Sequence, residues 1–300
     1  MNSVTVFSPA KVNLFLAVTG RRADGFHDLL SLAAPVTFGD TLKFEIRNSK
    51  FENSEGGFSL ECTDPGVPVD DSNLVLKAAR AFRAATGWRG GAKFTLEKHI
   101  PMGAGLGGGS SNGVAALRAL NALAGEPLGA AALAQLAAQL GSDCALFLHD
   151  GPVVLRGRGD IVEPLDASGG LARLRGRRLL IFKPDFGIST AGAYTALAGN
   201  YMPLAEAEAR LAGWLGDPKA PAEALLFNIF ERVAFSKYLA LPALLDELRR
   251  RFGFAPLMTG SGSACFAMLG ANTETPVHAV TTAIREAWGP SAFVVETTIA

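Results

Sequence analysis

Five of the seven residues from Gly103 to Gly109 are glycines, in the segment "PMGAGLGGGSSNG". Glycine loses more conformational entropy on ordering than any other residue, so such a run is costly unless bare backbone is needed there. A helical pattern follows directly, and backbone N–H groups at the start of a helix form a concave, partly positive site that suits phosphate oxygens. The segment therefore predicts an anion-binding loop, to which Ser110 and Ser111 can add hydroxyl donors or a metal ligand.

The glycine run alone leaves several kinds of loop open. A Walker A loop needs G-x-x-x-x-G-K-[ST], and the segment contains no such lysine. Gly103, Gly105 and Gly108 fit the dinucleotide fingerprint G-x-G-x-x-G formally, with Glu126 at a tolerable distance. That fingerprint requires a buried parallel strand before it, whereas residues 92–100 alternate between polar and apolar. A flexible loop capped by a serine is a further alternative.

A lysine and an asparagine interrupt the apolar strand pattern "SPAKVNLFLAV". Alternate residues of a strand share a face, so Lys11 and Asn13 point the same way. Either they face water on an edge strand or they have polar partners. Asp143 is the only charged residue between Glu126 and Asp150. It could cap a helical turn, or it could be a carboxylate near the phosphate site that a nearby lysine keeps ionised.

The composition indicates a compact protein. Of 300 residues, 49% are hydrophobic and 19% charged, and the net charge is zero, so nothing favours disorder or a nucleic-acid partner. The three cysteines are far apart and lack C-x-x-C spacing, which predicts reduced thiols in the cytoplasm. We see no signal-peptide layout and no apolar run of about 18 residues, and we expect no membrane partner. Nothing in the sequence specifies the oligomeric state.

The elements that must position these residues alternate between runs of strands and runs of helices, which favours an α+β fold. We expect strands over residues 4–8, 11–20, 29–38, 40–48 and 92–100, and helices over 70–87, from the glycine run to Gly125, and over 131–141. Asp71 or Ser72 is expected to cap the first helix and Gly87 to end it. Residues 141–159 are expected to form a loop and a hairpin that turns at Asp150–Gly151.

The pattern restarts beyond about residue 160. We expect a strand over 177–184, helices over 190–199, 205–216, 225–235, 241–253 and 275–289, two strands around a Gly-Ser turn within 255–270, and a last strand over 292–299. The chain is therefore expected to form two domains, residues 1–155 and 156–300.

Three segments together resemble the motifs of the GHMP kinases (galacto-, homoserine, mevalonate and phosphomevalonate kinases). "PAKVN" resembles their N-terminal motif, "PMGAGLGGGSSNG" their glycine-rich motif and "TGSGSACFAM" their C-terminal motif, in the family's order. The resemblance implies an ATP-binding N-terminal domain with the ribosomal S5 domain 2-like fold and a ferredoxin-like C-terminal domain. The segment Gly20–His27, G-x-R-x-D-G-[YF]-H, is most similar to the branch that phosphorylates an alcohol bearing a cytidine diphosphate group, in the non-mevalonate route to isoprenoid precursors.

The resemblance also implies roles for individual residues. Asp143 would accept or orient the hydroxyl proton, and Lys11 would keep Asp143 ionised. The substrate-binding residues would be Asn13, Phe26, His27 and Tyr194, with His27 reading the cytosine edge and the rings of Phe26 and Tyr194 stacking on the base. ATP would be the co-substrate and would carry Mg²⁺ with it; we identify no protein ligand set for a metal. The implied ATP-binding residues are Asn73 and Lys98, which match positions near the adenine, and those at and before the loop that would cradle the phosphates: Pro101, Met102, Gly103, Ala104, Gly105, Leu106, Gly107, Gly108, Gly109, Ser110, Ser111 and Asn112.

The chain departs from the family pattern at two places. Phe26 stands where the family most often has Tyr, which keeps stacking but removes the hydroxyl, and Cys144-Ala145 replace Val or Ile followed by Pro. Residues 260–262 are expected to form a turn facing the phosphates, or alternatively a purely structural hairpin. The rival functions are a kinase for another alcohol, such as mevalonate or homoserine, a nucleotide-binding or regulatory protein without catalytic activity, and a dehydrogenase that binds a nicotinamide cofactor.

Overall fold

Two long strands, β1 (Ser3–Arg21) and β2 (His27–Arg47), open the chain and are neighbours in one sheet. The computed structural model describes residues 3–47, 57–166, 170–270 and 277–300. Residues 1–10, 39–100 and 107–148 form unit 1, and residues 11–38, 101–106 and 149–300 form unit 2. The division into domains at residue 155 stays a prediction.

The expectation of four strands over residues 4–48 is wrong, because β1 and β2 are each continuous. Gly39, the residue between the strands expected over 29–38 and 40–48, lies inside β2. A Cβ at Gly39 would collide with the carbonyl oxygen of Ser8 and would lie 2.8 Å from Cα of Pro9. The glycine therefore permits a close approach of two backbones rather than a turn.

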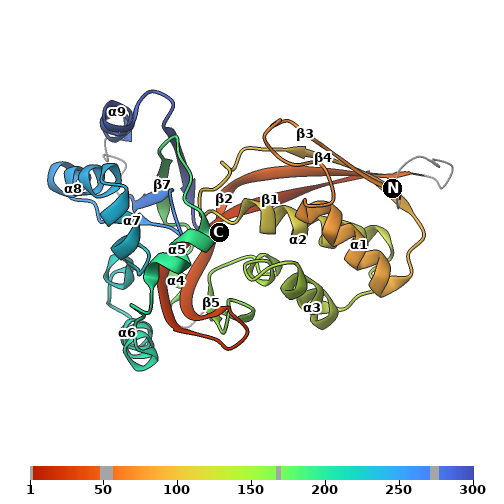
Figure 1. Cartoon of the computed structure of the whole chain (residues 1–300), viewed down its shortest axis with the longest axis horizontal. Coiled ribbons are helices and arrows are strands. Elements are labelled where there is room, and N and C mark those ends of the chain that lie inside the picture. The colour runs from red at the N-terminus through yellow and green to blue at the C-terminus, as the bar shows by residue number, and fades with distance from the viewer. Residues whose placement is uncertain (1–2, 48–56, 167–169, 271–276) are drawn as a thin grey trace. The chain divides into compact units, whose positions relative to one another are not determined.

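Unit 1 is a layer of strands covered by helices. Its further elements are β3 (Phe58–Cys62), α1 (Leu74–Thr86), β4 (Gly91–Glu97), α2 (Gly108–Leu123), α3 (Ala130–Leu140) and a 3₁₀ helix (Ala145–Leu148). Strand β4 pairs in parallel with β3 and antiparallel with residues 41–47 of β2. Figure 1 shows α1, α2 and α3 together on one side of these strands. The rings of Phe44 and Phe94, 5.2 Å apart, lie fully buried in this core.

Helix α1 is capped by a residue other than those expected. Asn73 is the N-cap, and its Oδ1 accepts the N–H of Val75 at 2.9 Å. Ser72 instead donates to Asp70, and Asp71 pairs with Arg80. Gly87 ends the helix at φ 68°, as predicted.

Unit 2 contains a second sheet, in the order β11-β7-β10-β9, whose pairs are antiparallel. Its strands and helices are β5 (Val153–Arg156), β6 (Ile161–Pro164), α4 (Leu171–Leu174), β7 (Arg178–Lys183), α5 (Thr190–Leu197), α6 (Leu204–Gly216), a 3₁₀ helix (Ala222–Leu225), β8 (Phe227–Asn228), α7 (Glu231–Lys237), α8 (Ala240–Phe252), β9 (Leu257–Met258), β10 (Cys265–Met268), α9 (Val277–Trp288) and β11 (Phe293–Thr298). Helices α7, α8 and α9 gather beside β7 (Figure 1). The antiparallel pair β9–β10 confirms the two strands expected around the Gly-Ser turn.

Two expectations in unit 2 are wrong. The helix expected over 225–235 is interrupted, because β8 pairs with β1 and α7 begins only at Glu231. The Asn228 side chain fixes this break, since its Nδ2 donates to the carbonyls of Met258 and Gly260 and its Oδ1 accepts the N–H of Phe230. The hairpin turns between β5 and β6, not at Asp150–Gly151.

The sheets and helices confirm the α+β class. Of the predicted elements, Asn48 and residues 275–276 lie outside the described residues. Within the part of the chain that the structure describes, no helix is long and apolar enough to cross a membrane.

Candidate active site

The first half of the glycine-rich segment packs against the Gly260–Gly262 turn. Gly103, Gly105 and Gly107 all have left-handed backbones, with φ of 60°, 75° and 73°. A Cβ at Gly105 would collide with the carbonyl oxygen of Thr259 and would lie 3.1 Å from the nitrogen of Gly262. Both the backbone conformation and the close contact therefore require glycine at position 105.

Helix α2 begins at Gly108 without a side-chain cap. Its N-cap is Gly107, and Ser111 makes an early backbone bond of the helix, its N–H donating to Gly107 O at 2.9 Å. The N–H groups of the first turn have no partner within the helix and carry its positive dipole end. This start of a helix, reached through bare backbone, has the features of an anion-binding site.

Ser110, Ser111 and Asn112 have partners within unit 1. Ser110 hydrogen-bonds the thiol of Cys144. Ser111 and Asn112 are buried, and the hydroxyl of Ser8 donates to Ser111 Oγ while Asn112 Nδ2 donates to Ser8 Oγ, both at 2.8 Å. Their contact with ATP stays a prediction.

Lys11 and Asn13 form a buried polar pair on β1. Each is only 4% exposed, so an edge strand facing water is excluded. Lys11 Nζ donates to Asn13 Oδ1 at 2.6 Å, and Asn13 Nδ2 donates to the hydroxyl of Ser31 at 2.9 Å. The N–H of Asn13 donates to Thr259 Oγ1 at 2.9 Å, which joins the N-terminal and C-terminal motifs. The N–H of Lys11 donates to Leu106 O at 3.0 Å, so the glycine-rich segment is anchored to the same strand.

Asp143 lies in the turn between α3 and the 3₁₀ helix of unit 1. It is half-buried, and its neighbour Cys144 is fully buried with its N–H donating to Gly141 O at 3.1 Å. Burial, with a smaller contribution from the charge of Asp143, raises the pKa of the Cys144 thiol to about 11. The thiol is therefore neutral beside the carboxylate. Lys11 belongs to unit 2 and Asp143 to unit 1, and their convergence stays a prediction.

His27 lies in an aromatic cluster of unit 2. Its ring stacks on Tyr194 at 4.7 Å and meets the edge of Tyr201 at 5.7 Å, and Tyr194 packs edge-on against Phe230. Burial first, and the positive charge of Arg21 second, lower the pKa of His27. A neutral imidazole offers one N–H donor and one acceptor, which are the groups needed to read the edge of a base.

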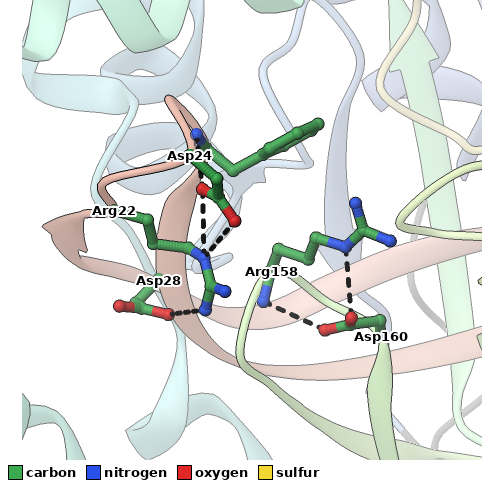
Figure 2. Close-up of polar contacts among 6 residues, drawn as sticks. Arg22, Asp24, Asp28, Arg158 and Asp160 are labelled. Atoms are coloured by element: carbon green, nitrogen blue, oxygen red, sulfur yellow. Dashed lines mark hydrogen bonds and ion pairs between the residues drawn. The ribbon is translucent and has the colours of Figure 1, made fainter.

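Phe26, next to His27, is 48% exposed and lies in an ordered turn. Figure 2 shows Arg22 between the carboxylates of Asp24 and Asp28. The N–H of Phe26 donates to Asp24 Oδ1 at 3.1 Å. The guanidinium of Arg158 lies 5.1 Å from the centre of the Phe26 ring. Its Nε donates a hydrogen bond to the carboxylate of Asp160. The ion pairs of Arg22 with Asp24 and Asp28 therefore stabilise the turn that leads to Phe26 and His27.

Lys98 and Asn73 of unit 1 both have defined roles. Lys98 Nζ forms a buried ion pair with Asp40 at 2.6 Å. Asn73 caps α1, and its Nδ2 donates to Pro68 O. Their predicted contact with ATP is not tested by these interactions.

Sequence reasoning missed Asp40, Thr259 and Arg158. Asp40 could have been found as an acidic residue inside an apolar strand, directly after a glycine. Thr259 opens the segment "TGSGSACFAM", but its bond to Asn13, 246 residues away, has no local signal, and neither does the contact of Arg158 with the ring of Phe26. Among the described residues, no group of three or more His, Cys, Asp or Glu side chains could hold a metal ion.

Comparison with known proteins identifies the family. Residues 73–151 match the GHMP kinases N terminal domain and residues 204–289 match the GHMP kinases C terminal family. The 4-diphosphocytidyl-2-C-methyl-D-erythritol kinase of Protochlamydia amoebophila (strain UWE25) is 39% identical over 266 residues, 89% of this chain and 84% of that protein. The protein of the same name from Thermotoga maritima is 36% identical over 271 residues, 89% of this chain and 92% of that protein.

Solved structures agree with these matches. A crystal structure of 4-(cytidine 5'-diphospho)-2C-methyl-D-erythritol kinase has a TM-score of 0.75 and 33% identity, covering 99% of this chain and 100% of that one. Homoserine kinase from Cytophaga hutchinsonii has a TM-score of 0.73 at 20% identity, covering 100% of this chain and 95% of that one, and so shares the fold. The chain, with its glycine-rich segment and its two matched regions, belongs to the GHMP kinase family.

Proposed function

We propose that this protein is a kinase that transfers the terminal phosphate of ATP to the 2-hydroxyl of 4-diphosphocytidyl-2-C-methyl-D-erythritol, in the non-mevalonate route to isoprenoid precursors. The observation that carries the proposal is the identity of 39% to a relative of that name over 89% of the chain. The neutral His27 in its aromatic cluster supports a substrate with a base to be read. Residues 1–155 would form the ATP-binding domain and residues 156–300 the C-terminal domain.

Asp143 and Lys11 are the proposed catalytic residues. Phosphoryl transfer needs positioning and charge stabilisation more than covalent help from the protein. Asp143 would take or align the proton of the attacking hydroxyl. The ammonium of Lys11, fixed by Asn13 at 2.6 Å, would keep that carboxylate ionised and ease the approach of the hydroxyl to a charged phosphate.

The glycine-rich segment is the proposed phosphate site. Left-handed glycines and the start of α2 would present backbone N–H groups to the phosphates, with residues 101–112, Asn73 and Lys98 forming the nucleotide site. Mg²⁺ bound to ATP would neutralise charge on the phosphates, and the Ser110 hydroxyl, a hard oxygen donor at the start of α2, fits such an ion.

Substrate selection would depend on the turn that carries Phe26 and His27. The imidazole of His27 would pair with the edge of cytosine, and the rings of Phe26 and Tyr194 would stack on the base. A site built to hydrogen-bond a base leaves buried polar groups unmatched when the base is missing.

A cytoplasmic location also belongs to the proposal, since Cys62, Cys144 and Cys265 are free thiols.

A panel of alcohols tests the substrate. ADP release would be measured with the cytidine-bearing alcohol, mevalonate and homoserine, each with ATP and Mg²⁺. We expect kcat/KM for the cytidine-bearing alcohol to exceed that for the others by roughly 10⁴-fold. Turnover of mevalonate or homoserine with none of the cytidine-bearing alcohol would reassign the substrate, and no ADP release with any alcohol would favour a non-catalytic binder.

Asp143→Asn tests the chemistry. We expect transfer to fall by about 10²- to 10⁴-fold while ATP binding is retained, because the carboxylate acts on the hydroxyl rather than on the nucleotide. Asp71→Asn, at an exposed aspartate paired with Arg80, is the control and should leave the rate unchanged. Undiminished turnover in Asp143→Asn would show that Asp143 has no chemical role.

A further inference from the structure

A fully buried carboxylate lies in the sheet of unit 1. Asp40 of β2 is 0% exposed, and four donors converge on it. Its Oδ1 accepts the N–H groups of His99 at 2.7 Å and Ile100 at 2.8 Å, and its Oδ2 accepts Lys98 Nζ at 2.6 Å and Asn112 Nδ2 at 2.9 Å. Removing a carboxylate from water is energetically costly, so a charge at this depth requires this full set of partners.

The four donors lie on both sides of the glycine run Gly103–Gly109. Lys98, His99 and Ile100 come shortly before this run, and Asn112 comes after it, in the second turn of α2. One carboxylate therefore fixes the place where the segment leaves the sheet and the place where it enters the helix. The hydroxyl of Ser8 extends the network, because it accepts from Asn112 and donates to Ser111.

The network also places a cation at the start of α2. A Cβ at Gly108, the first residue of the helix, would lie 3.0 Å from Lys98 Nζ. The N-terminus of a helix already carries a partial positive charge, so an ammonium beside it is electrostatically unfavourable. The Lys98 ammonium and the positive end of α2 repel each other, so their proximity is favourable only when anions lie close to both. Asp40 supplies one anion, and a bound polyphosphate would supply the others.

We propose that Asp40 is a positioning residue for ATP, which holds the Lys98 ammonium beside the start of α2 and fixes both ends of the glycine-rich segment before the nucleotide arrives. This inference rests on the proposed ATP-dependent function and adds to it the group that pre-organises the nucleotide site. A site that is ordered before binding does not lose conformational entropy when the nucleotide binds, so the ordering increases nucleotide affinity.

The isosteric variant Asp40→Asn tests the inference. In the variant an NH₂ group takes the place of Oδ2 and can accept from neither Lys98 nor Asn112, while the remaining oxygen can still accept the two backbone N–H groups. We expect KM for ATP, and the Kd of a non-hydrolysable ATP analogue by titration calorimetry, to rise about tenfold to a hundredfold. KM for the alcohol should stay within about twofold, because the network does not include the predicted substrate residues.

Lys98→Gln provides the second arm and does not remove the buried acceptor. It should raise the Kd of the ATP analogue to a similar extent. The double variant Asp40→Asn/Lys98→Gln should have the same Kd for the analogue as the single variant that binds it less tightly, because the two residues act as one unit. If Asp40→Asn does not fold, a normal analogue Kd in Lys98→Gln overturns the inference.

Asn121→Ala is the matched control for a purely structural role. Asn121 is a buried residue at the other end of α2, and its side chain bonds the backbone of Leu128. This variant should lose thermal stability and keep the Kd of the analogue. If Asp40→Asn behaves in the same way, the network is structural and the inference is wrong. Failure of the wild type to bind the analogue would overturn the proposed function as well, which separates the two failures.

Discussion

His27 shows how its surroundings set the chemistry of a single side chain. Burial and the charge of Arg21 lower its pKa below the ordinary 6.5, so the imidazole is neutral at neutral pH. The folded state then takes up a proton at lower pH than the unfolded chain does. The contribution of His27 to the free energy of unfolding is therefore complete above the ordinary value, and it falls as the pH drops from that value through the lowered pKa.

The pH dependence of substrate binding tests this state of His27. KM for the cytidine-bearing alcohol should be constant from pH 8 down to about pH 6.5 and should rise at lower pH, when the ring gains its second proton and loses its acceptor. His27→Gln keeps a donor and an acceptor but does not titrate, so this variant should lack the acid limb. An unchanged acid limb in His27→Gln would assign it to another group.

The sequence predicts single residues well where a local rule applies. Strand alternation places Lys11 and Asn13 on one face, and that face is buried. An acidic residue inside an apolar strand pattern marks Asp40 as unusual, but no local rule says whether such an aspartate is buried. Its burial depends on donors at residues 98–100 and 112, far along the chain. The same limit applies to Thr259, whose partner Asn13 lies 246 residues away.

Backbone contact between two glycine-rich elements shapes the proposed phosphate site. Gly105 and Gly260 both have positive φ, and a Cβ at Gly260 would lie 2.7 Å from Gly105 O. The N–H of Ala264 also donates to Ala104 O at 3.1 Å. Each segment therefore excludes side chains from the other, and glycine in one motif depends on glycine in the second.

Gly105→Ala tests this contact. The new methyl group would need a left-handed backbone and would collide with Thr259 O, so we expect a loss of about 1–3 kcal/mol in the free energy of unfolding, measured in urea. Gly213→Ala is the matched control, because Gly213 lies inside α6 and a methyl group added there would have no neighbour within 4 Å. It should gain up to about 1 kcal/mol. Equal effects in the two variants would contradict the role assigned to the contact.

Elements with a strong period are predicted from sequence, and those set by distant contacts are not. The stripe of buried residues in α1 predicts that helix, and Gly87 predicts its C-terminal end, whereas its N-terminus lies at Asn73 rather than at the expected caps. Residues 227–228 lie within an equally apolar stretch, yet they pair with β1, and the side chain of Asn228 is bonded to the carbonyls of Met258 and Gly260. The helical pattern of residues 225–235 contains no information about hydrogen-bond partners at residues 258 and 260.

Across the whole molecule, the reactivity of the three thiols follows burial. Cys62 is partly exposed, whereas Cys144 and Cys265 are fully buried. Burial raises the pKa of Cys144 to about 11 and that of Cys265 well above its ordinary value. Since the thiolate is the nucleophile, the two buried cysteines are protected both by exclusion of the reagent and by protonation.

Thiol titration with a chromogenic disulfide reagent at pH 8 tests this order and, with it, the packing around the proposed catalytic aspartate. The native protein should release about one equivalent of chromophore and the protein in denaturant about three, since only Cys62 is accessible without unfolding. Cys62→Ser should abolish the native reaction. Residual slow labelling of Cys144 in that variant would then report local opening of the turn that holds Asp143. Rapid labelling of Cys144 in the native protein would show that this turn is open, and a fixed carboxylate at position 143 would be excluded.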